Sequence, residues 1–271
     1  MSASTSITKC VILARGLGKR MRQDDTATSL DLAQSSAAEA GLKAMVPVGR
    51  PFLDYVLTAL ADAGFNQACI VIGPEHDAVR NYYTCTNPPT RIQIDFATQA
   101  RPLGTANAVL AAEAFAGTDE FLAINSDNYY PPGVLRVLQS QSQPGTVLFK
   151  AASLVRHSNI PEHRVKAFAA CLVDRDGFLA DIVEKPEDKQ VDPCKLISMN
   201  CWRFAPTIFA ACQDVPLSPR EEYELPLAVR LAVQRGLKFK TVVSHAGVLD
   251  LSRRSDIAAV AERLKDVQVR L

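Results

Sequence analysis

The chain has 271 residues, of which 48% are hydrophobic, and its 30 Lys and Arg against 29 Asp and Glu leave a net charge of +1. A single unit of this length can bury about three-quarters of its unfolded surface, so it needs neither disulfides nor a structural metal to fold. The even charge balance argues against a general nucleic-acid-binding protein, which usually carries a strongly basic domain.

Short apolar segments alternate with longer segments of helical period, which is typical of a parallel sheet covered by helices. In chain order, the strand candidates are Cys10–Leu13, Ala68–Ile72, Ile92–Ala97, Phe121–Asn125, Thr146–Lys150, Ala167–Val173, Leu179–Glu184, Ile197–Phe204 and Phe239–Val243. The helix candidates are Phe52–Ala63, Glu75–Tyr83, Thr105–Phe115, Gly133–Ser140, Thr207–Cys212, Leu225–Arg235 and Ser255–Leu264. After about residue 150 the alternation weakens into a hairpin, with Asp174–Gly177 as its turn, and a long strand. We therefore expect an α/β fold, a Rossmann-like doubly wound mixed sheet in one domain over residues 1–271.

The seven cysteines indicate the compartment. They are odd in number, form no C-x-x-C pair and mostly lie in apolar runs, which predicts buried free thiols in a reducing environment. The residues after Met1 are small and polar, and no 18-residue apolar run occurs. We therefore expect a soluble, cytoplasmic protein with no membrane partner.

The segment Cys10–Met21 is a predicted strand that runs directly into a basic, glycine-containing loop. Gly16 and Gly18 let the backbone pass close to a ligand, and Arg20 adds a planar fork suited to phosphate. A Walker loop is excluded because its lysine would be followed by Ser or Thr, and a dinucleotide fingerprint lacks its third glycine at Met21. By itself the loop fits either a nucleotide site or an ordinary strand-to-helix turn.

Five further motifs follow the loop in order. They are Lys43–Val48 with Arg50–Tyr55, Gln99–Ala106, Ile124–Asn128, Glu184–Pro186 and Gly247–Asp250. Together with the loop, they resemble the sugar-1-phosphate nucleotidyltransferase family, from about Lys9 to about Leu264. The resemblance implies a nucleotide-diphospho-sugar transferase (GT-A-like) architecture, with a nucleotide-binding half at about 9–150 and a sugar-phosphate-binding half at about 151–264.

The resemblance also implies a reaction, in which a sugar-1-phosphate oxygen attacks the α-phosphorus of a nucleoside triphosphate and pyrophosphate leaves. Its partners would be an NTP and a sugar-1-phosphate, without nucleic acid, and a homo-oligomer is compatible with it. A phosphate monoester is mostly dianionic at neutral pH, since its second pKa is about 6. The enzyme then needs positioning and charge stabilisation rather than a strong base.

Asp127 follows the apolar run 121–124, so we expect it at the carboxyl end of a parallel strand, where ligands bind in open α/β sheets. The residues alone are explained as simply by an Asx turn that ends the strand. By resemblance, Asp127 is a Mg²⁺ ligand and Asp250 is the second carboxylate, although Leu249 stands where the family usually has an aromatic residue. Mg²⁺ commonly takes one or two carboxylates and leaves its other positions to water and phosphate.

The basic residues of the motifs would hold the two substrates. By resemblance, Arg20 and Lys43 bind the triphosphate, Lys185 binds the sugar phosphate, and Glu184 and Asn200 contact the sugar. The alternatives are solvated surface charges for the first pair and a salt-bridged strand end for Lys185. The catalytic set that we expect is Arg20, Lys43, Asp127, Lys185 and Asp250.

Recognition of the base would fall to backbone groups of the first loop and to Gln99, whose amide can pair with the imide edge of a pyrimidine. The expected nucleotide-binding set is Leu13, Ala14, Gly16, Gly18, Arg20, Gln99, Gly104 and Thr105. The spacing from Gln99 to Ala106 is closest to the uridylyl- and thymidylyl-transferring branch, which predicts UTP or dTTP. Pro102–Ala106 also resembles the guanylyl-transferring branch, so a GTP-using enzyme for mannose- or heptose-1-phosphate is the alternative.

Three positions depart from the family pattern: Arg15, Lys19 and Ser126 stand where small residues or glycine are usual. They make a non-catalytic regulatory relative that binds nucleotide sugar a competing hypothesis, although the retained catalytic set argues against it. The polar insertion Gln23–Gly41 is interpreted as a surface insertion, since added loop length costs little. A lid is the alternative, because the insertion lies between two expected phosphate-binding elements.

Overall fold

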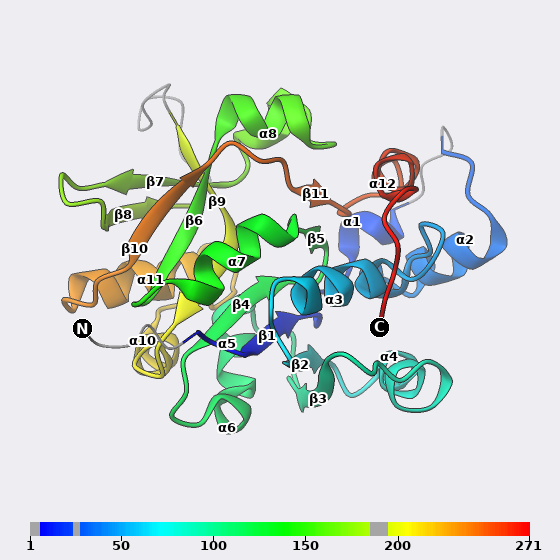
Figure 1. The fold of residues 1–271 in the computed structure, drawn as a ribbon, viewed down its shortest axis with the longest axis horizontal. Helices are drawn as coiled ribbons and strands as arrows, with labels where there is room; N and C mark the ends of the chain where they lie inside the picture. The colour runs from blue at the N-terminus through cyan, green and yellow to red at the C-terminus, as the bar shows by residue number, and fades with distance from the viewer. Residues whose placement is uncertain (1–5, 24–27, 185–194) are drawn as a thin grey trace.

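The computed structural model describes residues 6–23, 28–184 and 195–271, and a mixed sheet forms its centre (Figure 1). Over these residues the sheet has nine strands in the order β10-β6-β9-β4-β1-β2-β3, with β7 beside β9 and β8 beside β7. The strands are β1 (Lys9–Leu13), β2 (Gln67–Ile72), β3 (Gln93–Thr98), β4 (Phe121–Asn125), β6 (Gly145–Lys150), β7 (Ala169–Val173), β8 (Leu179–Val183), β9 (Leu196–Phe204) and β10 (Lys240–Ser244). The predicted α/β fold with a mixed sheet is confirmed, whereas the single-domain organisation stays a prediction.

The direction of the strands places the site. β4, β1, β2 and β3 run parallel, so their carboxyl ends meet at one edge of the sheet. β9 runs antiparallel between β4 and β6, which ends the parallel half. The predicted hairpin is present as β7–β8, where Asp174 Oδ1 accepts hydrogen bonds from the backbone N–H groups of Asp176 and Phe178.

Helices cover both faces of the sheet (Figure 1). They are α1 (Lys19–Arg22), α2 (Leu32–Glu39), α3 (Phe52–Asp62), α4 (Asp77–Asn81), α5 (Thr105–Ala111), α6 (Glu113–Ala116), α7 (Pro132–Ser140), α8 (Ala151–His157), α9 (Glu162–Val165), α10 (Ile208–Asp214), α11 (Leu225–Gln234) and α12 (Asp256–Leu264), with a 3₁₀ turn η1 (Lys43–Met45) and a π turn η2 (Tyr82–Thr86). Cys10 and Ile12 of β1 face the core under α3 and α7, and Val11 and Leu13 face the core under α5, α10 and α11. Burial on both sides explains why β1 is a continuous apolar run. None of the helices in the described part of the chain has the length and apolarity that a membrane crossing needs.

Two expected helices differ from the sequence pattern. The residues expected to form one helix over Glu75–Tyr83 form α4, which continues into the wider π turn η2. The helix expected over Thr105–Phe115 is divided at Ala112, where φ is −96° and ψ is 8°, outside the helical region. Helices α8 and α9 were not predicted, because one or two turns give too little periodicity. Local interruptions of this kind depend on neighbouring elements rather than on residue type.

The insertion between α1 and η1 contains helix α2, which begins with a capping box. Asp31 Oδ1 accepts a hydrogen bond from the Gln34 backbone at 2.7 Å, and Gln34 Oε1 accepts one from the Asp31 backbone at 3.2 Å. Gln34 Nε2 also donates to Pro47 O at 3.0 Å, and Arg22 Nη2 donates to Ala40 O at 2.7 Å. These contacts tie the insertion to the segments on both sides of it.

Two very short strands form a separate antiparallel pair, β5 (Asn128–Tyr129) with β11 (Leu249–Asp250). Asp250 is directly opposite Asn128 in this pair. Neither strand was predicted, since two residues carry no readable period. The pair brings a late segment of the chain to the end of β4.

Candidate active site

Asp127 and Lys43 form the clearest contact of the predicted site. The loop after β4 is tied to β1 by a hydrogen bond from Ser126 N to Leu13 O at 3.1 Å, which places Asp127 at the carboxyl edge of the sheet. Lys43 Nζ, on the 3₁₀ turn η1, donates to Asp127 Oδ2 at 2.8 Å. The side chains are 16% and 20% exposed, so solvent and ligands can reach the pair.

Asp250 reaches the same edge through the β5–β11 pairing. Leu251 N donates to Asp127 O at 2.8 Å, and Asn128 Nδ2 donates to Asp250 Oδ1 at 3.2 Å. Asp250 is buried, with 3% exposure. The structure therefore brings together three of the predicted catalytic residues, Lys43, Asp127 and Asp250.

Arg164, which belongs to no sequence motif, contacts Asp250 from the short helix α9. Arg164 Nη2 is ion-paired with Asp250 Oδ2, and Arg164 Nη1 with Asp256 Oδ1 at 2.5 Å. Ser252 Oγ donates to Asp250 Oδ1 at 2.8 Å. No sequence signal marks Arg164. Only the structure shows that this charged residue is buried, with 8% exposure, which is unusual for an arginine.

The charges of this cluster explain its titration. Burial and then the negative charge of Asp127 raise the pKa of Asp250 to about 6, against the opposing effect of the Arg164 guanidinium. Burial opposes the charge of Arg164, yet its contacts with Asp256 and Asp250 raise its pKa. Three carboxylates thus share the two cations Lys43 and Arg164, so the cluster keeps an excess of negative charge.

The two carboxylates of the predicted Mg²⁺ site differ in the partners that they already have. The described residues contain no group of three or more His, Cys, Asp and Glu side chains arranged to hold a metal. Asp127 is accessible and suits an ion that takes its other ligands from water and phosphate. Asp250 differs, because hydrogen-bond donors already occupy both of its carboxylate oxygens. Ligation by Asp250 stays a prediction, and this arrangement of its partners does not fit it.

The glycine loop is held in a conformation that requires glycine at one position. Gly18 has φ +61°, and a Cβ there would lie 2.6 Å from the Cα of Gly41. Gly16 has no atom within 4 Å of a Cβ, so its side is open. Arg20 is exposed in the first turn of α1, outside the contact between Lys43 and Asp127. Leu13 and Ala14 lie at the carboxyl end of β1, beside this loop.

The side chains of the predicted base-recognition residues already form hydrogen bonds within the protein. Gln99 is 4% exposed, and its Nε2 donates to Gly104 O at 3.0 Å and to Asn107 Oδ1 at 2.8 Å. The Thr105 hydroxyl accepts a hydrogen bond from Leu225 N at 2.8 Å. Gly104 has φ +110° and lies against the backbone of Tyr223. Base contacts by these residues stay predictions, and the Gln99 amide nitrogen is already used.

Arg15, one of the departures from the family pattern, lies beside Gln99. Its Nη1 is 2.8 Å from Glu75 Oε1, and its Nε donates to Gln99 O at 3.2 Å. The guanidinium is thus neutralised, with only 7% exposure. A Cβ on Gly73 would lie 2.5 Å from Glu75 and 2.7 Å from Arg15 Nε, so this glycine makes room for the pair.

The sugar half is described in part, since Lys185 lies outside the described residues. Glu184 Oε1 accepts from Arg220 Nη2 at 3.3 Å at the end of β8. Asn200 has φ +55° within β9, a left-handed conformation that Asn adopts more readily than most residues other than glycine. Its Oδ1 accepts a hydrogen bond from Trp202 Nε1 at 3.3 Å, and contact with a sugar stays a prediction. Trp202, two residues further along β9, is fully buried and stacks on Phe204.

Comparison with known proteins gives concordant results. The Nucleotidyl transferase family matches residues 9–265. The UTP–glucose-1-phosphate uridylyltransferase AglF of Haloferax volcanii is 26% identical over 259 residues, which cover 95% of this chain and 97% of the relative. A glucose-1-phosphate thymidylyltransferase of Streptomyces antibioticus is 26% identical over 270 residues, 97% of this chain and 68% of the relative. Among solved structures, a UDP-glucose pyrophosphorylase in complex with UDP-glucose matches with a TM-score of 0.75 at 18% identity. The match covers 97% of this chain and 100% of that structure's chain, so the two share a fold.

Proposed function

The chain belongs to the nucleotidyl transferase family, and on that premise we propose that it condenses UTP or dTTP with a sugar-1-phosphate in a Mg²⁺-dependent reaction. Its place among sugar-1-phosphate nucleotidyltransferases sets the reaction type, which yields a nucleotide sugar and pyrophosphate. The choice of base is supported by the names of the two relatives, a uridylyltransferase and a thymidylyltransferase acting on glucose-1-phosphate. Glucose-1-phosphate is therefore the first sugar substrate to test.

The contact between Lys43 and Asp127 carries the proposal. It joins a cation and a carboxylate at the edge of the sheet where α/β folds bind ligands, and both side chains are accessible. A lysine there lowers the repulsion between two phosphorylated substrates, which are otherwise kept apart by their charges. Positioning two polyanions is the main task of such an enzyme.

Each remaining group has a proposed role. Exposed N–H groups around Gly16 and the guanidinium of Arg20 bind the triphosphate, and Lys185 binds the phosphate of the sugar. Glu184 and Asn200 hold sugar hydroxyls. Mg²⁺ would be held by Asp127, and it would supply neutralisation of phosphate charge.

Pyrophosphate release tests the proposal directly. The chain is incubated with each of UTP, dTTP, GTP, CTP and ATP, with glucose-1-phosphate or mannose-1-phosphate, in Mg²⁺ or in excess chelator. We expect release only with a sugar-1-phosphate and Mg²⁺, and fastest with UTP or dTTP. Preference for GTP would overturn the base assignment. Binding of nucleotide sugar without any turnover would instead identify a regulatory relative.

A further inference from the structure

We propose that Arg164 takes the place of a metal ion at Asp250, so that a divalent cation in this site is held by Asp127 alone. Arg164 is then a positioning residue: its guanidinium holds the second carboxylate of the site in place and keeps it from the metal. The proposal rests on the proposed function only in assuming that the site takes a divalent cation. The family resemblance implied the opposite arrangement, in which both carboxylates are ligands.

The Asp250 carboxylate has little capacity left for a metal. Arg164 pairs with Oδ2, while Ser252 and Asn128 both donate to Oδ1. Asn159 also fixes the backbone of Asp250, accepting from its N–H at 2.9 Å and donating to its carbonyl at 2.8 Å. Both the main chain and the side chain are therefore held, at 3% exposure.

Arg164 is held as firmly as the carboxylate that it binds. Its two Nη groups contact two different acids, the arrangement for which the planar guanidinium fork is suited. Asp256 is fixed in turn, because its Oδ2 accepts from the backbone N–H groups of Ser252 at 2.9 Å and Arg253 at 2.8 Å. Moving Arg164 away would leave two buried carboxylates without their cation, which is strongly unfavourable.

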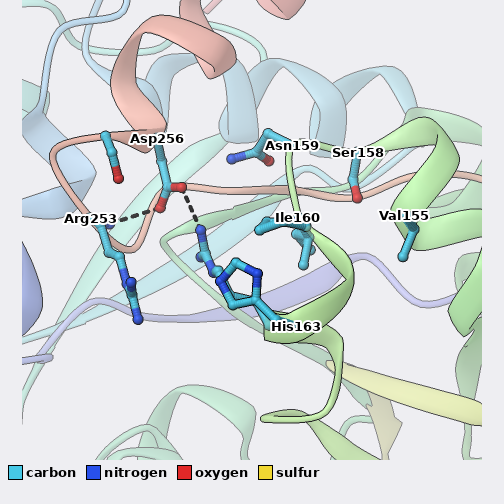
Figure 2. A pocket seen from close by; sticks show the side chains of 10 residues that line it. Val155, Ser158, Asn159, Ile160, His163, Arg253 and Asp256 are labelled. Atoms are coloured by element: carbon cyan, nitrogen blue, oxygen red, sulfur yellow. Dashed lines mark hydrogen bonds and ion pairs between the residues drawn. The ribbon is translucent and has the colours of Figure 1, made fainter. Parts of the chain in front are cut away.

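A pocket of about 500 Å³ lies beside this ion cluster, and Arg164 and Asp256 of the cluster line it (Figure 2). Figure 2 shows Asp256, Arg253, Asn159 and His163 around it, and Arg164 also lines it. Arg253 is exposed there, and Asp256, which pairs with Arg164, lines the same pocket. Asp250 does not line the pocket, so an ion in it would meet the Arg164 guanidinium rather than the Asp250 carboxylate.

Access to the three carboxylates also favours a single cation at Asp127. Lys43 pairs with Asp127, whereas Arg164 pairs with both Asp250 and Asp256. Asp127 has the greatest exposure of the three, 20% against 4% for Asp250 and 5% for Asp256. Asp127 is therefore the carboxylate of the three that a divalent ion can reach most readily, in exchange for the contact with Lys43.

Binding of Mn²⁺ alone, followed by calorimetry and electron paramagnetic resonance, tests the proposal without any turnover. We expect Asp127→Asn to weaken Mn²⁺ binding by at least on the order of 10-fold, the lower end for disturbing a metal site. Asp250→Asn should weaken Mn²⁺ binding far less than Asp127→Asn does, because Asp250 does not bind the metal. Arg164→Gln should tighten Mn²⁺ binding, because it frees Asp250 to join Asp127. If Mn²⁺ binding to the wild type is too weak to measure, the appearance of measurable binding in Arg164→Gln tests the proposal.

The matched control is Arg203→Gln, which removes another buried arginine; Arg203 lies on β9 and pairs with Glu120. It should lower stability without changing Mn²⁺ affinity. Should Arg164→Gln fail to fold, Arg164→Gln with Asp256→Asn removes a cation and an acid together and should show the same gain. Equal losses in Asp127→Asn and Asp250→Asn, or no gain without Arg164, would overturn the proposal. Absence of turnover with every substrate, with this Mn²⁺ pattern intact, would reject the proposed function alone.

Discussion

Lys43 and Asp127 are 84 residues apart in the chain, and the fold brings Nζ of the first to 2.8 Å from Oδ2 of the second. The pair lies where the strand β4 ends and the insertion rejoins the core, through η1. Because both side chains keep some exposure, the contact is available to be exchanged for contacts with substrate phosphates. Its residues are therefore the first to test by mutation.

Asp127→Asn should lower turnover by at least on the order of 10²-fold, the scale for losing one preorganised electrostatic element. Thermal stability should stay the same or rise slightly, since a partly exposed ion pair contributes about 0–1 kcal/mol and the repulsion from Asp250 is relieved. Pyrophosphate release and thermal melting measure the two effects. Asp119→Asn is the matched control, because it removes the carboxylate of another lysine pair, Lys9–Asp119 at 2.7 Å. Near-normal turnover in Asp127→Asn would exclude a catalytic role.

The glycine loop offers a paired test of structure against ligand contact. Gly18→Ala should lower the free energy of unfolding by at least about 1 kcal/mol, because it places a side chain at φ +61° against Gly41. Gly16→Ala should leave the melting temperature unchanged, since nothing lies near its Cβ. If the loop binds phosphate closely, Gly16→Ala will still weaken NTP binding in calorimetry. Unchanged NTP binding in this variant would place the triphosphate elsewhere.

The division of substrates between the two halves predicts opposite binding defects. Arg20→Ala should weaken NTP binding by on the order of 10- to 100-fold, the scale of a lost charge-assisted hydrogen bond, and spare the sugar phosphate. Lys185→Ala should do the reverse. Arg20→Lys should not restore full affinity, because an ammonium cannot replace a two-pronged donor. Lys265→Ala, which removes an exposed lysine paired with Glu262, serves as the control. Equal losses of both ligands in both variants would contradict this division.

His76 should make stability depend on pH. It is 4% exposed, and its Nδ1 accepts a hydrogen bond from Gly73 N at 3.3 Å. Burial lowers its pKa below the usual 6.5, and Arg15 and Arg22 lower it further against the opposing effect of Glu75. The unfolded chain then binds a proton before the folded one, so stability is lost as pH falls below 6.5 towards the lower folded pKa.

Melting temperatures at pH 8 and pH 5 test this effect. The fall in melting temperature on acidification should be smaller in His76→Gln than in the wild type. His163→Gln replaces an exposed histidine and should keep the wild-type fall. An unchanged pH dependence in His76→Gln would mean that other groups control it.

Much of the sheet could be predicted because its strands are determined locally. The apolar runs at Cys10–Leu13 and Phe121–Asn125 are long enough to show burial on both faces, and the structure has them as β1 and β4. The position of Asp127 then follows, since the residue after a parallel strand lies at the ligand-binding edge. Gly18 is likewise a local feature, because its φ of +61° disfavours residues other than glycine.

The partners of the charged groups depended on the tertiary structure. The β5–β11 pair places Asp250 beside Asn128, 122 residues earlier, and strands of two residues leave no pattern to read. Arg164 belongs to no motif, and its partners Asp250 and Asp256 lie 86 and 92 residues away. A motif shows which residue types a site contains. The packing of distant elements decides which charges meet, because a buried cation binds whichever carboxylates the fold places within its reach.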